Sequence, residues 1–91
     1  MGLFGWLGKK KAVTYKIVDR RGRAKYLGAT SFPAARRVQH YQSGKTGRLV
    51  VTSRPLPRRT ALRQETRNIS SYRRATGRNP RYNKTWNGKF N

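Results

Sequence analysis

Hydrophobic and polar residues alternate most clearly near the start of the chain. Val13, Tyr15 and Ile17 occupy every second position, and Thr14 and Lys16 lie between them. A period of two is typical of a β-strand with one buried face. This stretch therefore predicts a strand.

A tight-turn signature follows this strand. Asp19 opens and Gly22 closes a four-residue turn, because Asp accepts hydrogen bonds from nearby backbone N–H groups and Gly tolerates a positive φ. Ala24, Tyr26 and Leu27 then provide apolar positions for a return strand. The pattern predicts a β-hairpin.

The next segment predicts a helix of about ten residues. Thr30 or Ser31 is expected to be its N-cap, Pro33 fits the first turn, and Gly44 provides the stop. The residues at helical spacing predict a buried face, and the others are expected to point elsewhere. The predicted buried face is Ala34, Val38 and Tyr41, and the other face is Arg36, Arg37 and His40.

A third strand is predicted after Gly47. It contains residues 49–51, Leu-Val-Val, and Pro55 and Pro57 prevent it from continuing. Residues 12–53 are therefore expected to form a small ββαβ unit of the α+β class. Because apolar residues are few, this unit is expected to be marginally stable alone.

Segment 54–77 contains arginines at helical spacing. At about 100° per residue they fall within one arc, with apolar residues opposite. The arginine arc is Arg59, Arg63, Arg67, Arg74 and Arg78, and the apolar arc is Ala61, Leu62, Ile69 and Tyr72. An amphipathic helix is predicted, with Thr60 as its cap and Gly77 as its end. An Arg-rich coil is the alternative, because the segment also contains weak helix formers such as Asn and Ser.

The C-terminal segment, residues 78–91, contains a repeat. Every fourth residue is Asn, and each of the first three Asn is followed three positions later by an aromatic residue: Tyr82, Trp86 or Phe90. Pro80 and Gly88 oppose a continuous helix, so an extended basic tail is expected. Its aromatic residues are predicted to stack on nucleic-acid bases or to dock on a partner protein. A solvated tail is the remaining alternative.

The N-terminal arm, residues 1–11, combines bulky apolar residues with three lysines. The apolar residues are Leu3, Phe4, Trp6 and Leu7. Such a segment can insert at an anionic lipid surface, dock on a protein, or fold back onto a small core. Both arms are expected to be partly disordered when the protein is free.

Charge changes this picture most, because the 91 residues contain 23 Lys and Arg but only two acidic residues, which gives a net charge of +21. Self-repulsion of this size indicates a polyanionic partner, nucleic acid first and anionic membrane second. Arg outnumbers Lys, and the planar guanidinium group of Arg can donate two parallel hydrogen bonds to phosphate oxygens. The residues predicted to bind nucleic acid are Arg36, Arg37, Arg48, Arg54, Arg58, Arg59, Arg63, Arg67, Arg73, Arg74, Arg78, Arg81 and Lys84.

The composition indicates that this chain is not an enzyme and needs no cofactor or metal. Its acids, Asp19 and Glu65, lie far apart in the sequence, and His40 has no Cys with which to form a ligand cluster. His40 is expected on the helix surface. Residues 44–46, Gly-Lys-Thr, lack the preceding glycine of a phosphate-binding loop, so they predict a turn.

The function predicted from the sequence is sequence-nonspecific nucleic-acid binding by a structural protein of a large assembly. The arms resemble in design the small basic genome-packaging proteins of viruses, which implies a place in the virion interior beside a capsid. A ribosomal-type RNA-binding protein in the cytoplasm and a peripheral membrane protein are the alternatives. The sequence has no recognisable secretion signal, and it leaves DNA and RNA equally open.

Overall fold

The computed structural model describes residues 11–83 of the chain. Within this range the elements are β1 (Lys11–Val18), β2 (Ala24–Thr30), α1 (Pro33–Gln42), β3 (Arg48–Val51), β4 (Leu56–Pro57) and α2 (Arg58–Thr76). The predicted α+β class and the ββαβ order of the first four elements are confirmed. The short strand β4 was not predicted, because its two residues lie in the proline-containing stretch.

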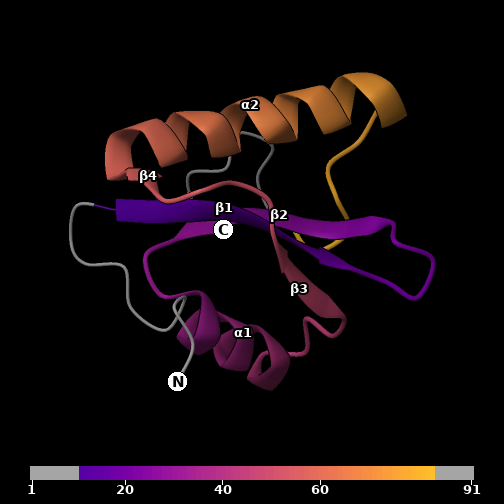
Figure 1. Cartoon of the computed structure of the whole chain (residues 1–91). Coiled ribbons are helices and arrows are strands. Elements are labelled where there is room, and N and C mark those ends of the chain that lie inside the picture. The colour runs from indigo at the N-terminus through magenta and orange to yellow at the C-terminus, as the bar shows by residue number, and fades with distance from the viewer. Residues whose placement is uncertain (1–10, 84–91) are drawn as a thin grey trace.

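The strands form one antiparallel sheet around β1 (Figure 1). β2 and β3 pair with opposite sides of β1, and β4 pairs with the amino-terminal end of β1. The predicted hairpin turn is confirmed, since the N–H of Gly22 donates to the carbonyl of Asp19 at 3.0 Å and Gly22 has a φ of 80°. The carboxylate of Asp19 accepts further hydrogen bonds from the N–H groups of Arg21 and Arg23.

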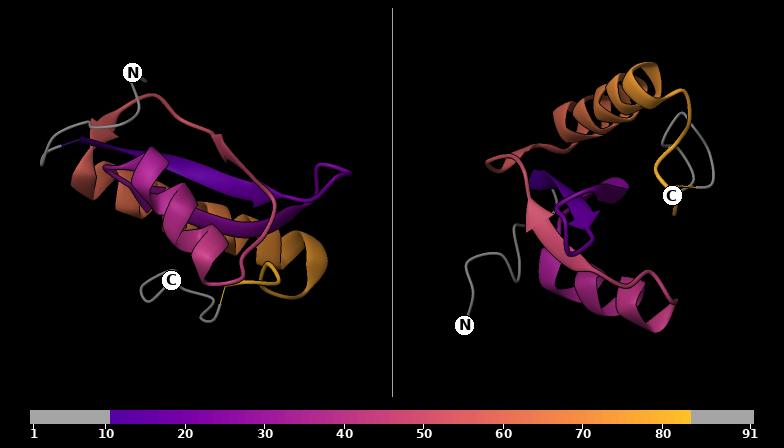
Figure 2. Two further views of the ribbon diagram at one scale, coloured as in Figure 1. Left: turned by 90° about the horizontal axis from the view of Figure 1, so that it is seen from below. Right: turned by 90° about the vertical axis from the view of Figure 1, so that its right-hand side faces the viewer.

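The two helices lie on opposite faces of the sheet, so the domain has three layers (Figures 1 and 2). β1 is consequently buried on both faces. Ala12, Thr14 and Val18 are as buried as Val13 and Tyr15. The strand predicted from the alternating pattern is confirmed, and Thr14, from the polar side of that pattern, is buried as well.

Aromatic side chains form the core between the sheet and α1. Tyr15, Ile17 and Tyr26 make up the buried cluster, with Leu49 packed against it. Gly28 lies opposite Tyr15 in the register of β1 and β2. A Cβ at Gly28 would come within 2.6 Å of the Tyr15 ring, so only glycine lets this ring lie across β2.

The orientation of α1 differs from the prediction. Ala34 is exposed, and Val38 and Tyr41 are 49% and 72% exposed. His40, expected on the surface, is instead 6% exposed, with its Nε2 at 2.7 Å from the hydroxyl of Tyr15. This hydrogen bond from the sheet selects the buried face of α1, and the apolar residues of the helix are left outside.

The ends of α1 agree only in part with the prediction. Pro33 is the first helical residue, as predicted, but the N-cap is Phe32 and no side chain caps the helix. The predicted cap at Thr30 or Ser31 is therefore wrong, because the Thr30 hydroxyl accepts the N–H of Phe32 instead. Gly44 follows the end of the helix with a φ of 87°, as its role as a stop requires.

Candidate nucleic-acid interface

The outer face of α2 carries a row of exposed arginines. The helix packs on the sheet through Ala61 and Ile69, which are both 0% exposed, and Glu65 between them is 6% exposed. The opposite side is exposed to solvent and contains Arg59, Arg63, Arg67 and Arg74, which we call the arginine ridge. Residues four apart lie on the same face of a helix, so the first three follow one line along α2.

The amphipathic helix itself was correctly predicted, and the Arg-rich coil is excluded. Gly77 ends α2 in the left-handed conformation, with a φ of 79°. The predicted cap at Thr60 is wrong, since α2 begins at Arg58 after Pro57. Leu62 is also misplaced in the predicted apolar arc, because it is 48% exposed beside the ridge.

The ridge is electrostatically unfavourable in the free protein. Like charges at i and i+4 destabilise a helix by a few tenths of a kcal/mol per pair. The first turn of α2 contains no acidic residue, and Arg58 and Arg59 lie there beside the positive end of the helix dipole. Bound anions would relieve both repulsions, so this helix is suited to a polyanionic partner.

A hollow of about 640 Å³ follows the ridge. Its lining consists of Arg59, Leu62, Arg63, Glu65, Thr66, Arg67, Ser70 and Arg74. These residues span most of α2 and come from no other described element. The surface they form is elongated, which suits a chain of phosphates better than a compact ligand.

The other predicted cations do not all join this surface. Arg36 and Arg37 belong to α1 on the far side of the sheet, Arg48 begins β3, and Arg54 lies between β3 and β4. Arg58 and Arg73 lie within α2, whereas Arg78 and Arg81 follow it. The structure thus brings together only part of the predicted set. Lys84 lies outside the described residues.

Of the predicted aromatic residues, the structure describes only Tyr82. Its side chain is half-buried against the aromatic core cluster. The Nζ of Lys25 lies 5.0 Å and the Cζ of Arg81 lies 6.0 Å from the centre of its ring. A hydrogen bond with Thr46, together with Lys25, lowers the pKa of Tyr82. Trp86, Phe90, Leu3, Phe4, Trp6 and Leu7 lie outside the described residues.

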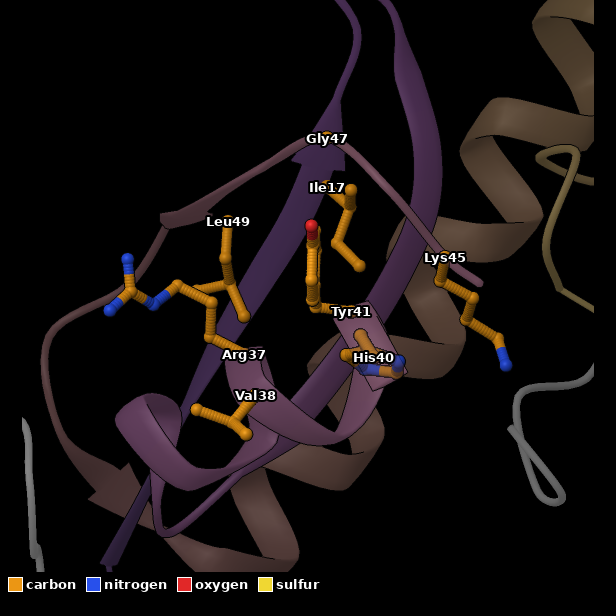
Figure 3. Close-up of a pocket in the computed structure, with 8 residues that line it drawn as sticks. All are labelled: Ile17, Arg37, Val38, His40, Tyr41, Lys45, Gly47 and Leu49. Atoms are coloured by element: carbon orange, nitrogen blue, oxygen red, sulfur yellow. The ribbon is translucent and has the colours of Figure 1, made fainter. Parts of the chain in front are cut away.

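A second hollow, of about 290 Å³, lies between α1 and the sheet (Figure 3). Its apolar lining includes Ile17, Val38 and Leu49, and the ring of Tyr41 stands beside them. The charged ends of Arg37 and Lys45 point away from these residues (Figure 3). This hollow therefore suits an apolar group, because its cationic side chains do not point toward a common position where a phosphate could bind.

The buried polar cluster beneath α1 is held neutral. Burial lowers the pKa of His40 to about 4, with the charges of Arg36 and Lys45 acting in the same direction. Burial also raises the pKa of Tyr26 to about 12, and it raises that of Tyr15 further. Near neutral pH the side chains of His40, Tyr15 and Tyr26 are therefore uncharged, and α1 is attached to the sheet through these neutral groups.

The sequence did not reveal the cations of the hairpin. Arg23 and Lys25 lie in a hollow together with Arg78 and Arg81, although more than fifty residues separate the two pairs. The hairpin turn was predicted, so the position of Arg23 near its end could have been found. The approach of residues 78–83 to β2 depends on hydrogen bonds for which the sequence has no recognisable signal.

Within residues 11–83, no three His, Cys, Asp or Glu side chains come close enough to hold a metal ion. Neither described helix is long and apolar enough to cross a membrane. Comparison of the chain with protein-family models, with curated proteins and with solved structures gives no match.

Proposed function

We propose that this protein is a sequence-nonspecific nucleic-acid-binding structural protein that neutralises phosphates within a large nucleoprotein assembly. The observation that carries the proposal is the arginine ridge on the outer face of α2. In a chain with a net charge of +21, this helix provides an ordered, exposed line of guanidinium groups. Guanidinium forks match phosphate oxygens in geometry and charge.

The length of the ridge suits a nucleic-acid backbone. Arg59 and Arg74 are fifteen residues apart on α2, which corresponds to about 22 Å at the helical rise. One strand of a duplex has about six phosphates in this length of its axis, and because the strand winds around the axis, a straight helix faces only some of them. A single ridge can therefore contact several successive phosphates, and their contributions to the affinity add up.

The polar residues of α2 support binding without base readout. Gln and Asn side chains are the usual readers of adenine in the major groove. Gln64 and Asn68 are half-buried, and the Nε2 of Gln64 donates to the Oδ1 of Asn68 at 2.9 Å. These two amides are engaged with each other, and the ridge itself presents guanidinium groups to the backbone.

The apolar surface of α1 supports a role within an assembly. Val38 and Tyr41 are exposed beside the hollow of Figure 3, on the opposite side of the sheet from the ridge. The strong positive charge disfavours a second copy of this chain as the occupant. The expected partner is a protein that presents an apolar side chain among carboxylates, as in a capsid lining. A ribosomal protein contact is the alternative.

The proposal is tested by measuring affinity for a DNA and an RNA duplex as a function of salt. Each neutralised phosphate contributes about −0.7 to −0.9 to the slope of log K against log salt, so we expect a slope steeper than about −3. The variant with Arg59→Gln, Arg63→Gln and Arg67→Gln should lose at least about tenfold in affinity and flatten this slope.

A variant of equal charge provides the control. Arg37→Gln, Arg48→Gln and Arg54→Gln remove three exposed cations from other elements. We expect its affinity to fall by less than about threefold, because distant charges act only through the screened general field. Equal losses in the two variants would show that net charge, and not the ridge, causes binding. A strong sequence preference would contradict nonspecific binding.

A further inference from the structure

The chain beyond α2 returns to the sheet and is fixed there. Gly77 turns it out of the helix, and its N–H donates to the carbonyl of Arg73 at 2.7 Å. Five residues later, the N–H of Tyr82 donates to the carbonyl of Lys25 at 2.7 Å. Pro80 is buried on the way. The return segment is therefore part of the folded domain.

Asn83 closes this connection with a two-sided hydrogen bond. Its Oδ1 accepts the N–H of Leu27 at 2.9 Å, and its Nδ2 donates to the carbonyl of Leu27 at 3.0 Å. Asn83 is 5% exposed, so water competes little for these bonds. Residues 78–81 are thus held beside the hairpin from both ends. The hydrogen bonds of residues 82 and 83 fix their carboxyl-terminal end, and the connection to α2 fixes their amino-terminal end.

This arrangement brings four cations from two distant segments to one hollow. Arg23 and Lys25 come from the hairpin, and Arg78 and Arg81 come from the return segment. The hollow measures about 530 Å³, and Ala24, Tyr72, Asn79 and Asp19 complete its described lining. Figures 1 and 2 show the hairpin turn and the carboxyl end of α2 at the same end of the molecule.

The single carboxylate of this hollow leaves most of the positive charge uncompensated. Asp19 accepts the backbone N–H groups of Arg21 and Arg23 at 2.8 and 3.0 Å. These hydrogen bonds lower the pKa of Asp19, so it is ionised near neutral pH and offsets one cation of the four. Lys25 and Arg81 are both placed against the ring of Tyr82. Holding these cations together is unfavourable without an anion.

We infer that this hollow, the hairpin-end pocket, binds one phosphate group of a nucleotide, with the base against Tyr72. Arg is the residue that recognises phosphate by paired hydrogen bonds, and three of the four cations are Arg. The volume lies within the range of ordinary ligand sites. This inference rests on the proposed function, and it adds a compact single-phosphate site to the elongated arginine ridge.

The test uses the full chain and thymidine 5′-monophosphate, which carries one phosphate and one base. NMR titration should give saturable shifts of the Tyr72 ring and of the Arg23 and Arg78 side chains. Arg23→Gln with Arg78→Gln should weaken this binding by at least about tenfold, because charge-assisted hydrogen bonds are lost. The matched control, Arg37→Gln with Arg54→Gln, removes equal charge from exposed positions outside both the pocket and the ridge and should change it by less than about twofold.

Equal weakening in both variants would overturn the pocket, and so would shifts in the wild-type protein that do not saturate. The wild-type titration decides the matter even if the double variant does not fold. The source of the phosphate is distinguished with an oligothymidine that has either a 5′-phosphate or a 5′-hydroxyl. If the wild-type protein binds the 5′-phosphorylated strand more tightly and the pocket variant does not, the pocket binds a terminal phosphate. If the variant loses the same affinity for both strands, the pocket binds an internal phosphate.

The same measurements separate this inference from the proposed function. Saturable mononucleotide binding, combined with duplex binding that does not depend on salt, would leave the pocket standing and contradict the ridge. Salt-dependent duplex binding without saturable mononucleotide binding would contradict the pocket alone.

Discussion

The two helices of this protein cover opposite faces of one sheet, but they are attached by different interactions and present different surfaces. α2 packs through Ala61 and Ile69 and exposes arginines. α1 buries only Pro33 and His40 among its ten residues, and it exposes apolar side chains, including Tyr41. α2 is thus attached through fully buried apolar residues together with one buried carboxylate, that of Glu65, whereas α1 is attached through a buried imidazole.

This difference shows that the buried face of a helix is decided by what the sheet offers it. The face of β1 toward α1 presents the hydroxyl of Tyr15, which requires a polar partner when buried. His40 supplies that partner at 2.7 Å. The arginines of the ridge are kept away from the sheet by their charge, so on α2 the buried face includes Ala61 and Ile69 of the apolar pattern, although Glu65 is buried with them and Leu62 is exposed.

The largest expected effect is on the attachment of α2. Ile69→Ala should lower the free energy of unfolding by about 3 kcal/mol, because it removes buried methyl groups and leaves a cavity. Urea unfolding followed by circular dichroism measures this change. Leu62→Ala on the same helix is the control and should cost less than about 1 kcal/mol, since Leu62 is 48% exposed. Similar losses at both positions would show that α2 does not pack on the sheet through Ile69.

The attachment of α1 should depend on pH. The pKa of His40 is about 4 in the folded protein, below its ordinary value of about 6.5 in an unfolded chain. The unfolded state therefore binds more protons between these values, and stability is lost as the pH falls through this window. Between pH 8 and pH 5 we expect a loss of about 2 kcal/mol from this residue.

Urea unfolding at a series of pH values checks this dependence, and His40→Gln is the reference. Because Gln does not titrate, the variant should be less stable at pH 8 but should show a flatter pH profile between about pH 6.5 and pH 5. Parallel profiles for the two proteins would show that His40 is not buried as the neutral form.

The smallest expected effect concerns the outer surface of α1. Val38→Ala should change the free energy of unfolding by less than about 0.5 kcal/mol, because Val38 is 49% exposed. The same urea titration measures it, with Ile69→Ala for comparison. A loss above about 2 kcal/mol would mean that the originally predicted face, with Ala34, Val38 and Tyr41, is the buried one.

The sequence predicted elements better than contacts. The hairpin, α1, β3 and α2 all follow from local signals: a period of two, an Asp-Gly turn, and glycines at the helix ends. The face of α1 was wrong because the pattern counted Val38 and Tyr41 as core, and it contained no sign that Tyr15 requires His40. Local patterns do not identify a specific polar partner that is distant in the sequence.

The candidate interface was also predicted only in part from the sequence. The arginine ridge follows from spacing, because exposed charge and helical period agree, but Arg78 was wrongly included in the predicted arc, since α2 ends at Thr76. The hairpin-end pocket was not predicted, since it requires Asn83 to bind Leu27 across 56 residues. Tyr82 was assigned to an extended tail because the Asn and aromatic repeat was interpreted without its contact to β2.

The bond between Asn83 and Leu27 also bears on how these molecules behave when crowded. β2 forms one edge of the sheet and β3 another, and edge strands with free backbone groups tend to join neighbouring molecules edge to edge. The net charge of +21 makes copies of the chain repel one another, and any polyanion that neutralised this charge would remove that protection. Tyr82 and Asn83 occupy backbone groups of Lys25 and Leu27 on this edge, so the strand resists aggregation under the conditions in which charge no longer prevents it.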